Sequence, residues 1–442
     1  MHTFDENSVM NISLPTGWSL ERLKFVCKNI TDGSHFSPAT TKEGKHYITV
    51  SDVYDGKVNL ENSLMISEED FATLVKAGCQ PPQGAVLLSK DGTVGRTAIV
   101  NDNDYVVLSS LGILTPGDNV SSQFLRYSLD SLFLQEQMKK AMAGSALRRI
   151  TIAKINELVT VVPPKEDQEA IVAYLDNKVS AIDTIIKKAI ELKNSLDSYR
   201  RCFVSEHVTH GFVPNREMKI TGIPAFPEIP SNWEAVKIKY TLVQNKDGIK
   251  IGPFGSSLTN KVFDDGPFKV YGQWNIVDGN FSNGKNYVQE DTYNDLRAYE
   301  VVPGDMLVSM MGTIGKCAVI PNGIQHGIMD SHVIKIRLNH DMVINDYFDL
   351  VYDKDNSNIV FTQIGEQKKG SIMDGLNSTI VKNLFIPLPP IEEQNIIVRA
   401  IKERTASIDE AIRGVNKQLE FLQEYRTSII FDAITGNSGV KD

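Results

Sequence analysis

The stretch GAVLLSKDGTVGRTAIV at 84–100 occurs a second time in the chain, as GDMLVSMMGTIGKCAVI at 304–320, and the two align without a gap. Most of the differences are conservative, such as Arg96 against Lys316. The first copy reads as a strand, a turn at Asp91-Gly92 and a second strand, because β-branched and apolar runs flank a turn-forming pair. The repeat predicts two domains built around the same hairpin.

Working outward from this hairpin, further matches occur in the same order. Pro-Thr-Gly-Trp at 15–18 returns as Pro-Ser-Asn-Trp at 230–233, and VVPPKEDQEAIV at 161–172 returns as PLPPIEEQNIIV at 387–398. The offset between the copies grows only from 215 to 226 along the chain. We therefore interpret the sequence as one duplicated unit with small loop insertions in the second copy.

Each unit begins with a globular part, predicted over 14–164 and 229–390. Both parts mix apolar runs with Gly, Asp and Asn breaks. We expect strands at 105–114 and 332–338 and a helical segment at 121–142. This pattern predicts an α+β fold, with two repeated α+β domains joined by two long helices.

Each unit ends in a long helix, predicted over 165–207 and 391–434 after a Pro-Pro pair. Apolar residues recur every seven positions, which favours two helices packed as an antiparallel coiled coil about 60 Å long. The alternative is a long amphipathic helix lying on its own domain, and Lys193 and Arg200 interrupt the apolar series. The predicted coiled-coil seam contains Leu175, Ile182, Leu196, Ile408, Val415 and Leu422.

The remaining segments and the composition limit the protein class. A Pro-rich linker is predicted at 208–228 and a short tail at 435–442. The 442 residues carry a net charge of −9, and no apolar run reaches the roughly 18 residues of a membrane span. Four scattered cysteines and a polar, acidic start argue against a secreted disulfide protein. We expect a cytoplasmic protein with free thiols.

Familiar catalytic signatures are missing. Gly315-Lys316 fails the P-loop pattern, and the chain has no HExxH, no G-x-S-x-G and no Asn/Asp-Pro-Pro-aromatic methyltransferase motif. His207 and His210 are spaced like metal ligands, but Ala433 and Gly436 replace them in the second copy, so a surface pair is favoured. We expect no catalytic residue, no metal site and no cofactor bound by this chain.

Basic pairs and Gly/Ser-rich turns recur in both globular parts of this acidic chain. Such pairs are often solvated surface, but their recurrence favours contacts to phosphates. Candidate DNA-binding residues are Ser34, His35, Lys90, Arg96, Lys139, Lys140, Arg148, Arg149, Ser256, Ser257, Lys316, Lys368 and Lys369.

The pattern resembles the DNA-specificity subunit of Type I restriction–modification enzymes. The resemblance rests on the Pro-x-x-Trp openings, Gly-Thr-Ile-Gly-Lys at 312–316, FIPLPPIEEQ at 385–394 and the linker ending ITGIPAFPEIPSNWE. It covers nearly the whole chain twice, although VVPPKEDQ departs from the usual Leu-Pro-Pro form and Thr209-His210-Gly211 from a Thr-Gly end.

The resemblance implies a division of labour. Each globular part would read one half of a split target in double-stranded DNA, and the helices would separate them and dock two modification (methyltransferase) subunits. Restriction/translocase subunits would join that core, and S-adenosylmethionine, ATP and Mg²⁺ would belong to the partners. The alternatives are an orphan modification-only subunit, a protein-only coiled-coil scaffold and an unrecognised hydrolase. DNA binding would exclude the scaffold, and co-purification with a methyltransferase would exclude a solitary enzyme.

Overall fold

The structure is a computed structural model that describes residues 12–54, 56–143, 148–253, 257–258, 263, 265–368 and 375–437. The chain forms two compact units, Met1–Ala189 with Lys417–Asp442, and Ile190–Asn416. Each long helix is therefore divided between the units, whereas the sequence suggested separate helical parts. The described residues include no helix both long and apolar enough to cross a membrane.

In the first unit the central sheet has the strand order β2-β11-β8-β9, and a second sheet has the order β10-β4-β7-β3. Two small sheets, β1-β12 and β5-β6, complete it. The strands are β1 Ser19–Arg22, β2 Cys27–Asp32, β3 Thr40–Thr41, β4 Lys45–Ile48, β5 Val53–Tyr54, β6 Lys57–Val58, β7 Leu64–Ile66, β8 Val86–Ser89, β9 Thr97–Ile99, β10 Tyr105–Val107, β11 Leu111–Pro116 and β12 Val159–Val162. The short helices are α1 Leu23–Val26, α2 Glu68–Lys76, α3 Ser122–Asp130, α4 Leu132–Met142 and α5 Ile152–Glu157.

The second unit repeats this topology. Its sheets have the orders β16-β22-β19-β20, β18-β17-β21 and β15-β23, with β13-β14 added from the linker. The strands are β13 Met218–Ile220, β14 Glu228–Pro230, β15 Glu234–Lys237, β16 Ile249–Ile251, β17 Phe268–Tyr271, β18 Tyr287–Val288, β19 Met306–Ser309, β20 Cys317–Val319, β21 Gly327–Met329, β22 Val333–Ile336 and β23 Phe385–Leu388. The short helices are α7 Gln273–Asp278, α8 Glu290–Asp295, α9 Asn345–Tyr352, α10 Ile359–Lys368 and α11 Ser378–Asn383.

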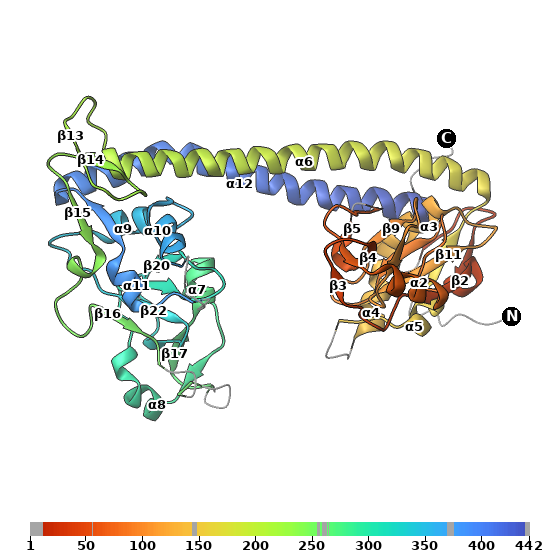
Figure 1. The fold of residues 1–442 in the computed structure, drawn as a ribbon, viewed down its shortest axis with the longest axis horizontal. Coiled ribbons are helices and arrows are strands. Elements are labelled where there is room, and N and C mark those ends of the chain that lie inside the picture. Colours follow the sequence, from red (N-terminus) through yellow and green to blue (C-terminus); the bar gives the residue numbers. More distant parts are fainter. Residues whose placement is uncertain are drawn as a thin grey trace. The chain divides into compact units, whose positions relative to one another are not determined.

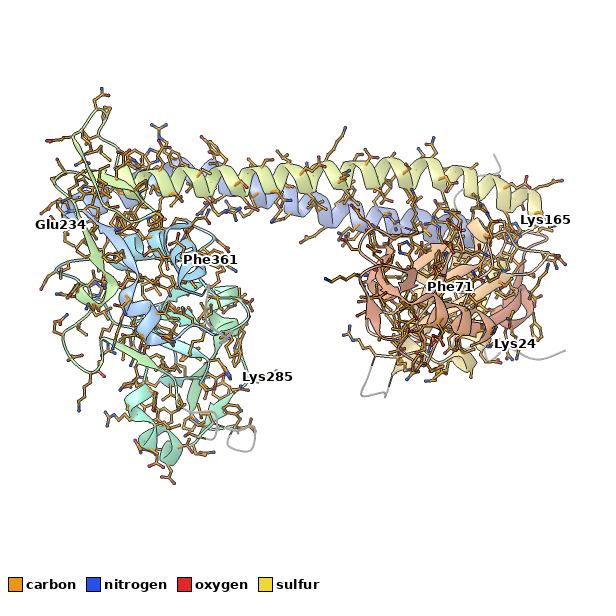
Figure 2. All side chains as sticks on the ribbon, in the orientation of Figure 1. Lys24, Phe71, Lys165, Glu234, Lys285 and Phe361 are labelled. Carbon is orange, nitrogen blue, oxygen red and sulfur yellow. The ribbon has the colours of Figure 1, made fainter. Side chains whose placement is uncertain are left out.

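The predicted hairpins are confirmed as β8 with β9 and β19 with β20, both antiparallel. Their strands are apolar at successive positions because both faces of the sheet are buried. Val86 and Leu88 face the core beneath the helices, and Leu87 faces the second sheet. At the turn, Gly95 has a φ of 100°, and a Cβ there would come within 2.3 Å of Gln135. Gly315 lies in the same way against the ring of Phe361. Phe361 is part of α10 and is labelled in Figure 2.

Two predicted elements differ from the structure. The segment 105–114 is two strands in different sheets, β10 and β11, because the chain turns between them at 108–110. The segment 121–142 is interrupted at Ser131, whose buried hydroxyl donates to the Ser128 carbonyl, so α3 and α4 are separate helices. Within the linker, β13 pairs with β14, which makes this segment part of the second unit.

The long helices are α6 Lys165–His210 and α12 Ile391–Thr435, each slightly longer at its C-terminal end than predicted (Figure 1). They pack antiparallel within each unit. In the first unit Leu175, Val179 and Ile182 share a buried core with Ile429 and Ala433. In the second unit, Val204 and Val208 share one with Ile397 and Ile401.

The residues predicted for the seam are buried to different degrees. Leu175, Ile182 and Val415 are buried, and Leu196, Ile408 and Leu422 are partly buried.

Candidate nucleic-acid interface

The first unit brings together several of the predicted DNA-binding residues. His35 follows β2, Lys90 follows β8, and Arg149 lies on the segment that enters α5. A β-bridge between Asp91 and Arg149 fixes that segment against the end of β8. Residues far apart in the sequence therefore meet at one end of the central sheet. The exposed Arg148 is next to this bridge, where its carbonyl accepts from the Gly92 amide.

Two of the predicted residues lie inside the molecule and are not on its surface. Lys90 is 1% exposed, and its ammonium is 3.2 Å from Asp32 and 3.8 Å from Asp91. Ser34 is 3% exposed and donates to the Phe36 carbonyl at 2.6 Å. Both side chains are used for internal contacts, so neither supplies the direct surface contact that the sequence suggested.

Three other cations of the first unit are exposed at different places. Arg96 follows the GTVG turn, and Lys139 and Lys140 lie in the last turn of α4. Lys139 pairs with Glu136 one turn earlier, at 2.5 Å. An exposed pair of this kind contributes little to stability, so Lys139 remains able to exchange its partner for a phosphate.

In the second unit, Ser257 is exposed, whereas Ser256, Lys369 and the side chain of Lys368 lie outside the described residues. Lys316 is tied to two carboxylates, Asp355 at 2.5 Å and Asp353 at 3.6 Å. Burial alone would lower the pKa of the Lys316 ammonium, but the hydrogen bond to Asp355 and the charge of Asp353 outweigh burial and raise the pKa. Its charge is therefore already balanced inside the unit.

In each unit the repeated turn is stabilised by a serine that was not among the predicted site residues. The Ser89 hydroxyl donates to the Thr93 carbonyl at 2.5 Å and accepts from the Arg96 amide. Ser309 makes the corresponding bond to the Thr313 carbonyl. Identity of this serine in both copies was the available signal, and it indicates that the turn has one fixed shape in both units.

The Glu-Asp-Gln and Glu-Glu-Gln triplets at 166–168 and 392–394 lie in the first turns of the two long helices. Gln168 accepts from the Ser121 amide at 3.0 Å and donates to two carbonyls, and Gln394 does the same with the Ile344 amide. Both are buried. The preceding carboxylates accept from the Trp18 and Trp233 indoles at 2.8 and 2.7 Å. These contacts join each long helix to its globular part.

The two residues that interrupt the apolar series form ion pairs, Lys193 with Asp197 on its own helix and Arg200 with Asp409. Arg200 donates to Asp409 at 2.7 Å in the second unit, and Arg426 donates to Asp183 at 2.8 Å in the first. The two pairs are equivalent positions of the repeat with the helices exchanged. They define the antiparallel register of α6 and α12, since a shift of either helix would separate both pairs.

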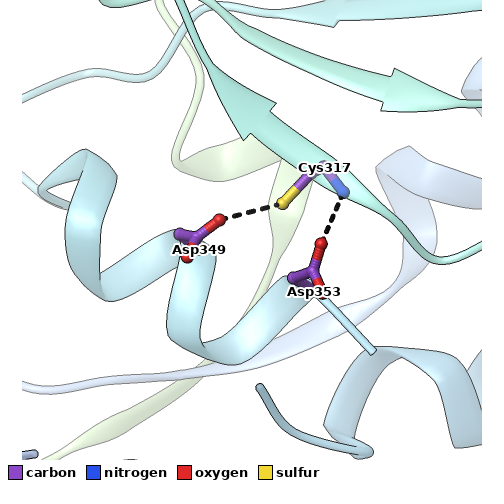
Figure 3. A group of neighbouring side chains, drawn as sticks. All are labelled: Cys317, Asp349 and Asp353. Carbon is purple, nitrogen blue, oxygen red and sulfur yellow. Dashed lines mark hydrogen bonds between the residues drawn. The ribbon is translucent and has the colours of Figure 1, made fainter. Parts of the chain in front are cut away.

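A buried polar group lies in the second unit, where Asn356 contacts both Arg200 and Asp349. Cys317 on β20 donates its thiol hydrogen to Asp349 at 3.5 Å, and its amide donates to Asp353 at 2.9 Å (Figure 3). The three ligand-type atoms lie within 4.8 Å of one another. They border a cavity of about 480 Å³ that Lys316 and Lys402 also line. Because Lys316 already neutralises this region, we interpret the group as a hydrogen-bonded part of the core.

The acidity of Asp349 gives a testable consequence. Burial first, and then the charge of Asp353, raise its pKa from 3.8 to about 6. The folded state therefore favours the neutral carboxyl, and the stability that this contributes is lost as pH rises through about 6. We expect Asp349→Asn to stabilise the protein at pH 8 by about 2 kcal/mol relative to pH 4.5. Denaturant unfolding of both proteins at the two pH values measures this difference.

Asp346→Asn is the matched control, because Asp346 is an exposed carboxylate on the same helix, paired with Lys402. Its effect should hardly change between the two pH values. An Asp349→Asn effect of equal size at pH 4.5 and pH 8 would contradict the assignment.

Comparison with known proteins identifies the repeated unit. The family model described as "Type I restriction modification DNA specificity domain" matches residues 15–194 and 245–420. A putative type I restriction enzyme MjaX specificity subunit from Methanocaldococcus jannaschii is 24% identical over 97% of this chain and 95% of its own. The type I restriction enzyme EcoBI specificity subunit from Escherichia coli is 20% identical over 92% of this chain and 84% of its own.

A solved structure shows the same fold. A chain from a study of complex assembly and conformational transition of the type I R-M system aligns with a TM-score of 0.60 and 17% identity. The alignment covers 96% of this chain and 99% of that one.

Proposed function

The chain belongs to the Type I restriction modification DNA specificity family, and from that premise we propose that each of its two units reads one half of a bipartite target in double-stranded DNA. The observation that carries this proposal is the duplication itself. The two units share the core of one topology, and α6 and α12 pair antiparallel within each of them. The strands of duplex DNA also run antiparallel, so a duplicated protein can contact both strands in one manner. Such a protein suits two half-sites of opposite orientation.

The different side chains of the two units support different half-sites. The hydrogen bonds of Ser89 and Ser309, and those of Gln168 and Gln394, are common to both units. The residues around this shared framework differ. Arg96 is exposed, whereas Lys316 at the equivalent position is paired with Asp355. A common framework with different surfaces fits a protein that reads two different sequences in one manner.

We further propose that catalysis is supplied by partners. Two modification subunits would dock on α6 and α12, and restriction/translocase subunits would join them, with S-adenosylmethionine, ATP and Mg²⁺ used by these partners. Tyr199 and Tyr425 are equivalent positions on the two helices, and both are exposed. Exposed aromatic side chains are enriched at protein interfaces, so these two favour a pair of equivalent docking sites. Such an assembly would act in the cytoplasm on chromosomal or incoming DNA.

Binding and methylation assays test the proposal. When the full-length chain and the methyltransferase subunits of its host are mixed with many duplexes, the complex should bind those that share one bipartite sequence. Affinity should fall steeply with salt, because phosphate contacts release counterions. The purified chain alone, given S-adenosylmethionine, should not methylate DNA.

Each alternative has its own outcome. Co-purified methyltransferase without any affinity for duplex DNA would favour a protein-only scaffold. Methylation of host DNA in the absence of any restriction subunit would identify an orphan modification-only system. Methylation or cleavage by the homogeneous chain would refute the division of labour.

A further inference from the structure

A buried lysine in the first unit holds two carboxylates that face the surface. The Lys90 ammonium lies 3.2 Å from Asp32, at the end of β2, and 3.8 Å from Asp91, in the turn after β8. Each carboxylate in turn holds one exposed donor. His35 Nε2 is 3.3 Å from Asp32, and Arg149 Nε is 3.0 Å from Asp91. His35 and Arg149 side chains are 68% and 48% exposed.

The second unit shows that this network is not needed by the fold. Gly112 pairs with Asp32 and Leu88, and Ile334 pairs with Ile251 and Val308, so Asp32 corresponds to Ile251. The Ile150 amide donates to the Lys90 carbonyl at 2.9 Å, and the Leu376 amide donates to the Met310 carbonyl at 2.8 Å. The backbone is therefore the same at these positions of both units.

On this shared backbone the side chains change as a set. The charged residues of the first unit are replaced in the second by apolar or small ones. In order, Asp32, Lys90, Asp91 and Arg149 correspond to Ile251, Met310, Met311 and Gly375. Met311 is 44% exposed. A network exchanged as a whole on an unchanged framework is expected where two domains read different ligands.

The charges of the network favour base reading over phosphate binding. Two acids balance Lys90 and Arg149, so the group offers little net charge to a phosphate. Arg149 Nε lies 3.0 Å from Asp91 in an ion pair, which restrains the guanidinium and leaves its two terminal nitrogens as parallel donors. Guanine presents two matching acceptors, O6 and N7, in the major groove. A guanidinium fixed in direction by a carboxylate is suited to distinguish guanine from other bases.

We propose that Arg149 reads a guanine in the half-site of the first unit, with Asp91 and buried Lys90 as positioning residues and His35 as a second fixed donor. In the second unit the exposed Met311 would contact a thymine methyl group at the corresponding place. The inference rests on the proposed function, and it names the base-reading residues of that function. Arg148, exposed beside Arg149, would contact the phosphate backbone.

The test selects bound duplexes from randomised libraries, using the full-length chain with the methyltransferase subunits of its host. Arg149→Ala should reduce the preference for guanine at one position of one half-site by about ten- to a hundredfold. The other half-site and the spacer should stay unchanged. Arg148→Ala is the matched control, which should weaken all duplexes alike and lower the salt slope by about one.

Further variants separate positioning from folding. Asp91→Asn and Lys90→Met should relax the same base position as Arg149→Ala, with a smaller change of the salt slope than Arg148→Ala causes. Because Lys90→Met leaves two carboxylates without their buried partner, the combined variant D32I/K90M/D91M/R149G supplies the complete residue set of the second unit. It should fold, keep the second half-site and lose the guanine.

The outcomes distinguish the inference from the function. An unchanged base preference in Arg149→Ala, or a uniform loss equal to that of Arg148→Ala, would overturn the inference while bipartite binding stands. A parent protein that selects no bipartite duplex would overturn the proposed function, and the inference with it.

Discussion

Lengthening α6 and α12 by one heptad each, after Lys188 and after Gly414, should lengthen the preferred spacer between the half-sites by about three base pairs. Seven residues add about 10 Å of helix, and a base pair occupies about 3.4 Å of duplex. Both half-site sequences should be retained, because neither globular part is altered. The measurement is methylation mapping of the complete assembly on duplexes with graded spacers.

The ion pairs of the seam explain why both helices must be extended. Each insertion falls between the two pairs, Asp183–Arg426 and Arg200–Asp409. A full heptad in each helix keeps the apolar seam and both pairs in register. Three base pairs also turn the duplex by about 100°. We therefore expect the best duplex of the variant to bind more weakly than the best duplex of the parent.

The control carries the same heptad in α6 alone. Arg200 would then lie about 10 Å out of register with Asp409 when Asp183 and Arg426 stay paired. This variant should lose stability and show no sharp preference for a longer spacer. If the doubly extended protein keeps the parent spacer, the helices do not determine the distance between half-sites.

The second large effect is expected from Gln394→Ala. The side chain is 0% exposed, and it bonds the Ile344 amide and the carbonyls of Met342 and Pro389. Truncation leaves the buried Pro389 carbonyl and the partly buried Ile344 amide and Met342 carbonyl without this partner. An unpaired buried group costs about 1–3 kcal/mol. We expect a loss of about 3 kcal/mol or more, confined to the second unit. Hydrogen exchange should show the Ile344 amide exchanging far faster.

Two further variants serve as comparisons for Gln394→Ala. Asn395→Ala changes the next residue, which is exposed and bonds only within its own helix, so it should have little effect. Gln168→Ala should affect the Ser121 amide of the first unit in the same way as Gln394→Ala affects Ile344. A Gln394→Ala protein with unchanged exchange at Ile344 would show that the glutamine does not join the helix to its domain.

The sequence alone determined the duplication, the paired hairpins and the two long helices, because these depend on order and periodicity along the chain. The seven-residue repeat also predicted that residues such as Leu175 and Val415 would face the partner helix, and both are buried. The role of Gln168 could have been predicted as well. A polar residue identical in both copies, directly after a helix start, was visible in the alignment.

Only the tertiary structure decided which charged residues are available to a ligand. Lys90 and Arg149 are both basic residues beside turns in the sequence, but Lys90 is buried, and its ammonium meets Asp32 from a separate strand as well as its neighbour Asp91. Lys316 likewise meets Asp353 and Asp355 from the end of α9. The burial and partner of a charge depend on residues that folding brings together from distant positions. The sequence around a lysine therefore does not specify its burial or all of its partners, because distant segments of the chain supply some of them.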